Sequence, residues 1–117
     1  MAMSRNAILA VDDLPRKEVP VERWHDTVWL RTITAAERDA YMLRARPTAD
    51  GGEPDYENFR ARLLVYCLCD ENGERLFDDH EDHLLGAKCG DAIGFLFTEA
   101  QKLNGLMPVA VEDARKN

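Results

Sequence analysis

The sequence predicts an α+β fold in which an N-terminal β-hairpin is followed by about four helices, with helix in the majority. Apolar and polar residues alternate with a period of two over residues 16–33, which is typical of half-buried strands. From residue 34 onward the apolar residues recur every three or four positions, which is typical of amphipathic helices. Strand pattern followed by helix pattern favours the α+β class.

The N-terminal end is expected to precede the hairpin without joining it. Residues 1–6 are predicted to be a loose tail. The segment AILAVDDLP, residues 7–15, is predicted to be a short anchoring segment, ended by its two aspartates and its proline.

The hairpin is predicted over residues 16–33, with its turn at WHDT, residues 24–27. Val19 and Val21 alternate with polar residues before that turn, and a similar alternation follows it. Pro20 has no backbone N–H to donate to a neighbouring strand, so we expect the first strand to lie at an edge of its sheet.

A helical body is expected over residues 34–104. TAAE, residues 34–37, is a capping box, in which a Thr hydroxyl and a Glu carboxylate each accept a free backbone N–H at the helix start. We expect that helix to end before Pro47. A second helix, capped by Asp55, becomes apolar on nearly every face over residues 63–69, and it is predicted to be the central helix.

The rest of this body follows from turn signals. DENG should end the central helix at CLC, with Gly73 at positive φ. Asp78 or Asp79 should cap a short helix at HEDHLLG, residues 80–86. Cys89 should cap the last long helix, whose apolar stripe is Ile93, Leu96, Phe97, Ala100 and Leu103.

The end of the chain should carry little structure of its own. Asn104-Gly105 is a strong helix stop. Residues 105–117 are predicted to form a short terminal helix from Pro108 and a frayed tail, so that residues 1–117 make one domain.

Composition limits the classes of partner. The chain has 117 residues, 22 acidic and 15 basic, for a net charge of −7 and a pI of about 4.9. This balance argues against nucleic acid or an anionic membrane surface as the main partner. There is no apolar run of the ~20 residues that a membrane helix needs and no signal peptide pattern, so we expect a cytosolic protein with free thiols.

The cysteines and histidines do not predict a metal site. Cys67 and Cys69 are separated by one residue, and on a helix such residues point in nearly opposite directions. His80 and His83 lie among aspartates and glutamates that compete for them. We therefore expect buried thiols beside a solvated acidic turn, with no metal and no cofactor.

The sequence also predicts no catalytic residue. Cys89 at a helix N-terminus is the one candidate nucleophile, because such a position lowers a thiol pKa. No oxyanion-hole motif or glycine-rich phosphate loop accompanies it. The chain is expected not to be an enzyme.

Four large apolar residues near predicted turns are the candidates for partner binding. Trp24 and Trp29 flank the hairpin turn, and Leu76 and Phe77 follow the DENG turn. Aromatic residues dominate many binding sites. Each of the four can alternatively serve to cover the core, and both interpretations stay open at this point.

Three segments together give the sequence a family resemblance. ITAAERD, CLCDENGERLF and LFTEAQKLNGL, in this order and spacing, resemble the tail assembly chaperones of long-tailed, siphovirus-type phages and their prophages. The likeness runs from about Ala7 to Asn117. None of these segments is a catalytic motif.

The resemblance implies a function. Such chaperones are thought to bind the tape measure protein before the tail tube forms, to keep it soluble, and to help recruit tail tube subunits. A longer form, made by ribosomal frameshifting near the stop codon, is thought to carry the tube-recruiting part. The resemblance also implies residence in the host cell cytoplasm and absence from the mature virion, with self-association left open. The alternative is a small cytosolic regulatory or adaptor protein of a prophage.

Overall fold

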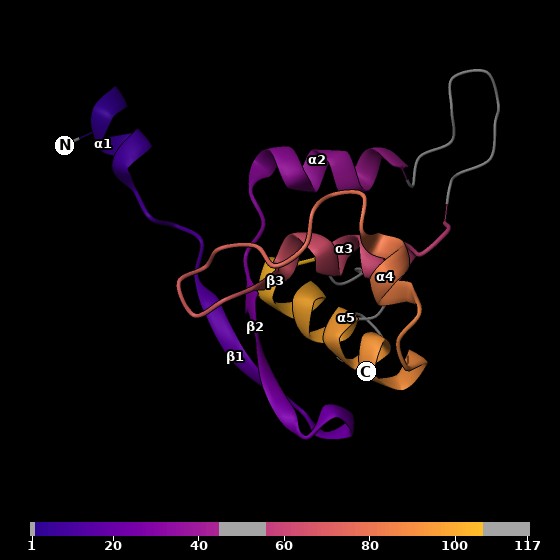
Figure 1. Cartoon of the computed structure of the whole chain (residues 1–117). Coiled ribbons are helices and arrows are strands. Elements are labelled where there is room, and N and C mark those ends of the chain that lie inside the picture. Colours follow the sequence, from indigo (N-terminus) through magenta and orange to yellow (C-terminus); the bar gives the residue numbers. More distant parts are fainter. Residues whose placement is uncertain (1, 45–55, 107–117) are drawn as a thin grey trace, which may run out of the picture.

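The computed structural model describes residues 2–44 and 56–106. The elements follow one another along the chain as Figure 1 shows: α1 (Arg5–Ala10), β1 (Arg16–Val21), the 3₁₀ turn η1 (Glu22–Trp24), β2 (Asp26–Arg31), α2 (Ala35–Arg44), α3 (Phe59–Cys67), β3 (Leu68–Cys69), α4 (Asp82–Gly86) and α5 (Gly90–Asn104). The predicted α+β class, with a hairpin before the helices and helix in the majority, is confirmed. No helix in the described part is long and apolar enough to cross a membrane.

Strands β1 and β2 form the predicted hairpin. They pair antiparallel, with Val19 opposite Val28 and Pro20 opposite Thr27. The connection is the single turn η1, ended by His25 in the left-handed region at φ 57°. The turn therefore comes earlier than the predicted residues 24–27, because Asp26 and Thr27 belong to β2. The strand order β1-β2-β3 leaves β1 at an edge, as Pro20 predicts.

The third strand was not predicted. CLC was expected to end the central helix, but the helix ends at Cys67, and Leu68 pairs with Leu30 of β2 while Cys69 pairs with Trp29. Two apolar residues show no periodicity, so the sequence does not distinguish a helix end from a strand. Extending the chain here satisfies backbone groups on the free edge of β2. The helical body predicted over residues 34–104 is therefore interrupted by a strand.

Helix α3 is the central element, as predicted. Every residue from Ala61 to Cys67 is buried, and Figure 1 shows α3 between α2 and α5. Phe59 at its start contacts the rings of Tyr41 and Phe97, with centroids 5.8 and 5.4 Å away. The helix starts at Phe59, later than expected, because the preceding Asn58 takes a left-handed conformation at φ 52°. The proposed cap, Asp55, lies outside the described residues.

Some of the helix ends and turns follow their local signals. At α2, the Glu37 N–H donates to the Thr34 hydroxyl at 3.1 Å, and the Thr34 N–H donates to the Glu37 carboxylate at 2.9 Å, so the capping box is confirmed. Gly73 and Gly105 have positive φ at the two predicted turns. Helix α4 is shorter than predicted: it starts at Asp82, and its N-cap is Glu81 rather than Asp78 or Asp79. The terminal helix from Pro108 lies outside the described residues.

A partly buried ionic cluster joins the sheet to α2 and to the loop after β3. The Arg31 side chain is 6% exposed and donates to both carboxylate oxygens of Glu37, at 2.9 and 2.7 Å. Arg75 lies 3.4 Å from the same carboxylate, 2.6 Å from Asp79 and over the ring of Tyr66. The period-two pattern of β2 does not predict a buried Arg31, which is accommodated because its charge is paired.

Helix α1 corrects two expectations about the N-terminal end. It begins at Arg5, with the Ser4 hydroxyl accepting the Ala7 N–H at 3.2 Å, so the predicted loose tail is wrong for Arg5 and Asn6. None of its residues is buried, and Figure 1 shows it apart from the sheet and the other helices. The first residues of the segment that was expected to anchor the chain therefore do not anchor it, whereas the carbonyl of its last residue, Pro15, accepts the Thr32 N–H at 2.9 Å.

Candidate partner-binding site

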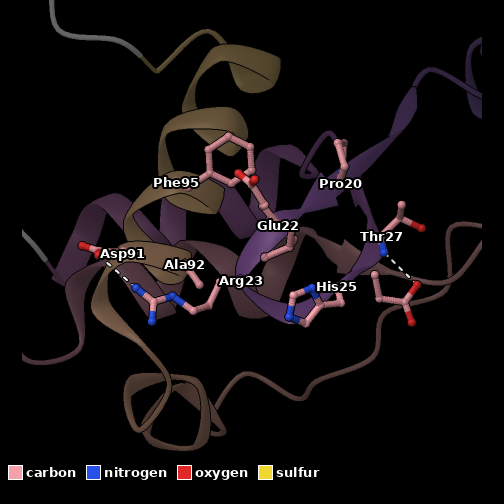
Figure 2. Close-up of a pocket in the computed structure, with 10 residues that line it drawn as sticks. Pro20, Glu22, Arg23, His25, Thr27, Asp91, Ala92 and Phe95 are labelled. Atoms are coloured by element: carbon pink, nitrogen blue, oxygen red, sulfur yellow. Dashed lines mark hydrogen bonds and ion pairs between the residues drawn. The ribbon is translucent and has the colours of Figure 1, made fainter.

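A concave surface lies between the tip of the hairpin and the first half of α5. We call it the tip groove, and it has a volume of about 970 Å³. One wall comes from the end of β1, η1 and the start of β2, and the other comes from α5, as Figure 2 shows. Its lining residues are Pro20, Val21, Glu22, Arg23, His25, Asp26, Thr27, Asp91, Ala92 and Phe95.

The base of the tip groove is apolar. Val21 and Ala92 are buried, at 2% and 3% exposure, and they belong to the hydrophobic core. Phe95 rises from α5 with 43% of its surface exposed, and in Figure 2 it lies with Pro20 on either side of Glu22. A large aromatic side chain left half in water at a concave surface is typical of a binding anchor.

Phe95 faces outward because of its position on α5. Its neighbours Leu96 and Phe97 lie on the core stripe and are buried, at 0% and 9% exposure. One residue before Leu96 is a rotation of about 100° away from it around the helix. Phe95 is therefore about 100° from Leu96 and about 200° from Phe97, outside the stripe of Ile93, Leu96, Phe97 and Ala100 that faces the core.

The rim of the tip groove is acidic. It carries the carboxylates of Glu22, Asp26 and Asp91 against the single guanidinium of Arg23. Arg23 lies 3.4 Å from Asp91, and both side chains are largely exposed, so this ion pair contributes little stability. Asp91 also sits in the first turn of α5, where a carboxylate offsets the positive end of the helix dipole.

The structure does not bring the four sequence-predicted contact residues into this groove. Trp24 and Phe77 are partly buried and pack against the core, and Trp29 is half-buried on β2. Leu76 is 55% exposed in the loop after β3, where its backbone N–H donates to the Leu68 carbonyl at 3.1 Å. Trp24 belongs to η1, whose neighbouring residues line the groove, but it does not line the groove itself.

Sequence reasoning missed Phe95 as a site residue, although a signal was present. The apolar stripe of α5 accounts for Ile93, Leu96 and Phe97, and Phe95 is a large aromatic residue that falls off it. Such a residue has no predicted partner in the core. The missing information was the hairpin tip opposite it, which comes from residues more than sixty positions earlier in the chain.

The cysteines occupy three different environments. Burial raises the pKa of the Cys67 thiol to about 12, and burial also raises the pKa of Cys69. The backbone N–H groups of Ala92 and Asp91 lower the pKa of Cys89 at the start of α5. Among residues 2–44 and 56–106, no group of three His, Cys, Asp or Glu side chains is placed to hold a metal ion.

Comparisons with known proteins agree on one kind of protein. The family model for the phage tail assembly chaperone matches residues 4–117. The solved structure of the bacteriophage HK97 tail assembly chaperone resembles this fold with a TM-score of 0.60 and 19% sequence identity, over 77% of this chain and 85% of that one. No curated protein matches the sequence.

Proposed function

Because the chain belongs to the phage tail assembly chaperone family, we propose that it binds the tape measure protein of its phage and keeps that protein soluble until the tail tube forms. The family match over residues 4–117 carries this proposal. The family consists of assembly helpers, so the chain is not an enzyme.

The surface of the domain suits a binding role. A chaperone for a helical, aggregation-prone protein must offer apolar surface while staying soluble itself. This chain combines a net charge of −7 with exposed apolar side chains at the tip groove and beyond it. We propose Leu76 as a contact, with the half-buried Trp29 and the parts of Trp24 and Phe77 that the core leaves uncovered also contributing.

The remaining parts of the proposed role concern where the chain acts and how it contributes to assembly of the tail tube. We propose that the chain helps to recruit tail tube subunits, through a longer frameshifted form, and that it acts in the host cell cytoplasm and is absent from the mature virion. Its acidity supports protein partners over nucleic acid.

Co-expression tests this function directly. The cognate tape measure protein is expressed with and without this chain, and the soluble fraction of the tape measure protein is measured after centrifugation. We expect the soluble fraction to rise severalfold with the chaperone present. An unchanged soluble fraction contradicts the proposal, as does retardation of duplex DNA by the purified chaperone at physiological salt.

A matched pair of variants tests the proposed contact. Leu76→Glu is compared with Leu84→Glu, because both leucines are about half exposed, at 55% and 46%, and only Leu76 is a proposed contact. We expect Leu76→Glu to lower the soluble fraction of the tape measure protein and Leu84→Glu to leave it unchanged. Equal effects of the two variants contradict the role of Leu76.

A further inference from the structure

We infer that the tip groove is the docking site for a basic amphipathic helix, about two turns of which lie against Phe95 with lysine or arginine side chains at the acidic rim. This inference rests on the proposed function, because it names the chemistry of the segment that the chaperone binds. Three observations carry it: the size of the groove, the charge of its rim and the character of the neighbouring sheet edge.

The size of the groove fits a short length of helix. An α-helix about 10 Å across fills a volume like that of the groove, about 970 Å³, over roughly 12 Å of its axis, or about two turns. Two turns present two or three apolar side chains on one face. Phe95 and Pro20 offer exposed apolar surface for that face, above the buried Val21 and Ala92.

The charge of the rim selects a basic partner. Of the four charged side chains at the rim, the guanidinium of Arg23 is already paired with Asp91. Glu22 and Asp26 remain on the same rim, and the rest of the chain is acidic as well. An acidic peptide would meet repulsion here, and a basic one would be attracted and oriented.

The edge of the sheet argues against an extended peptide as the occupant. A peptide that added a strand would pair with the free edge of β1, which reaches the groove at Pro20 and Val21. Pro20 has no backbone N–H, and such prolines block pairing at edge strands. A helix satisfies its own backbone hydrogen bonds and needs only the apolar base and the charged rim.

Two synthetic peptides test the inference in the wild-type protein. Both carry the same apolar stripe at helical spacing; one has Lys and the other has Glu at the polar positions. Binding is followed by fluorescence anisotropy. We expect the Lys peptide to bind at least about tenfold more tightly, with an advantage that shrinks as salt is raised. Equal affinities for the two peptides overturn the inference.

Variants locate the binding. Phe95→Glu should weaken binding of the Lys peptide by about tenfold or more, and Leu84→Glu, with similar exposure on α4, should change it by less than about twofold. Glu22→Lys should weaken binding and flatten its salt dependence. Asp39→Lys is the matched charge change on α2, which contributes no lining residue, and it should have a smaller effect. Equal effects within either pair overturn the inference.

A cross-linking measurement tests the binding site in the wild-type protein, so it does not require that the variants fold. The Lys peptide carries a photoactivatable phenylalanine in its apolar stripe, and we expect the cross-links in wild-type protein to map to Pro20 or Phe95. Cross-links elsewhere overturn the inference. If Phe95→Glu changes only the oligomeric mass in light scattering, the groove is instead an interface between copies. If the Lys peptide binds but co-expression does not raise the soluble fraction of the tape measure protein, the proposed function is contradicted and this inference is not.

Discussion

Asn104 shows how one polar side chain joins three elements. Its amide oxygen accepts the Ile33 N–H at 2.8 Å, and its amide nitrogen donates to the Ala100 carbonyl at 2.9 Å. The same nitrogen lies 3.6 Å from the sulfur of Cys67. The last turn of α5 is thereby fixed to the connection between β2 and α2 and to α3. Asn104 had been predicted only as part of a helix stop.

Replacing Asn104 with alanine should destabilise the domain. The variant Asn104→Ala leaves the Ile33 N–H buried without a partner, which costs about 1–3 kcal/mol of unfolding free energy. Urea unfolding followed by circular dichroism measures the change. Gln101→Ala on the same helix is the control and should cost less than about 0.5 kcal/mol. An Asn104→Ala variant as stable as the control would show that the hydrogen bond contributes nothing.

The raised pKa values predict loss of stability in alkali. Burial raises the pKa of Cys67 from 9.0 to about 12 and that of Tyr41 from 10.0 to about 12. The folded state therefore holds protons that the unfolded state releases, so this stability is complete below pH 9 and is lost as pH rises towards 12.

Unfolding free energies measured between pH 8 and 12 test the alkaline prediction. Each group can contribute a slope of up to about 1.4 kcal/mol per pH unit within its interval. We expect Cys67→Ala to be less stable at pH 8 but to decline less steeply between pH 9 and 10, where the unfolded state begins to release the thiol protons of Cys67 and Cys69 and the variant lacks the first of them. An unchanged slope there would contradict the assignment to Cys67.

At the scale of elements, helix α5 has one face in the core and one in solvent, and two adjacent residues lie on these different faces. Leu96 is fully buried and Phe95 is 43% exposed. Leu96→Asp buries an unpaired carboxylate at a cost of several kcal/mol and should unfold the domain. Phe95→Asp should leave it folded. Thermal melting compares the two variants, and a Leu96→Asp protein that melts at the wild-type temperature would contradict this placement of the stripe.

Two glycines offer a second contrast between elements. A Cβ added at Gly86 on α4 would clash with the Asn58 side chain, at 2.3 Å from its Oδ1 atom. A Cβ added at Gly94 on α5 would have no neighbouring atom within 4 Å. Gly94→Ala should stabilise the protein by about 0.5–1 kcal/mol through helix propensity. Gly86→Ala should instead lower the melting temperature, because Asn58 must move. Equal shifts would show that the Asn58 side chain can move aside without cost.

The sequence predicted long helices and strands better than short ones. Helix α5 repeats its apolar stripe over four turns, and its start and its stop at Gly105 were both predicted. Strand β3 has two residues and becomes a strand only because β2 lies beside it. The late start of α3 depends on Asn58 in a left-handed conformation, which no local pattern signalled. Local patterns therefore predicted what is local and missed what the tertiary structure imposes.

At the scale of the whole molecule, the tip groove was beyond sequence reasoning for a related reason. Val21 and Ala92 form its base together, yet they lie 71 positions apart in the chain. The sequence predicted that aromatic residues near turns bind the partner, but Trp24 and Phe77 are partly covered by the core. The acidic rim is a property of the assembled surface, although the net charge of −7 already indicated its sign.

We expect the pairing of β3 with β2 to be a late step in folding. Leu30 and Leu68 lie 38 positions apart, whereas the hairpin joins residues close in sequence. Closing the larger loop costs more entropy, so the hairpin and the helices should form before this pairing does. Leu68→Ala should therefore speed unfolding and leave the folding rate nearly unchanged, and stopped-flow kinetics can separate the two rates. A slowed folding rate would instead place β3 in the folding nucleus, so that sheet completion would be the step that commits the chain to its fold.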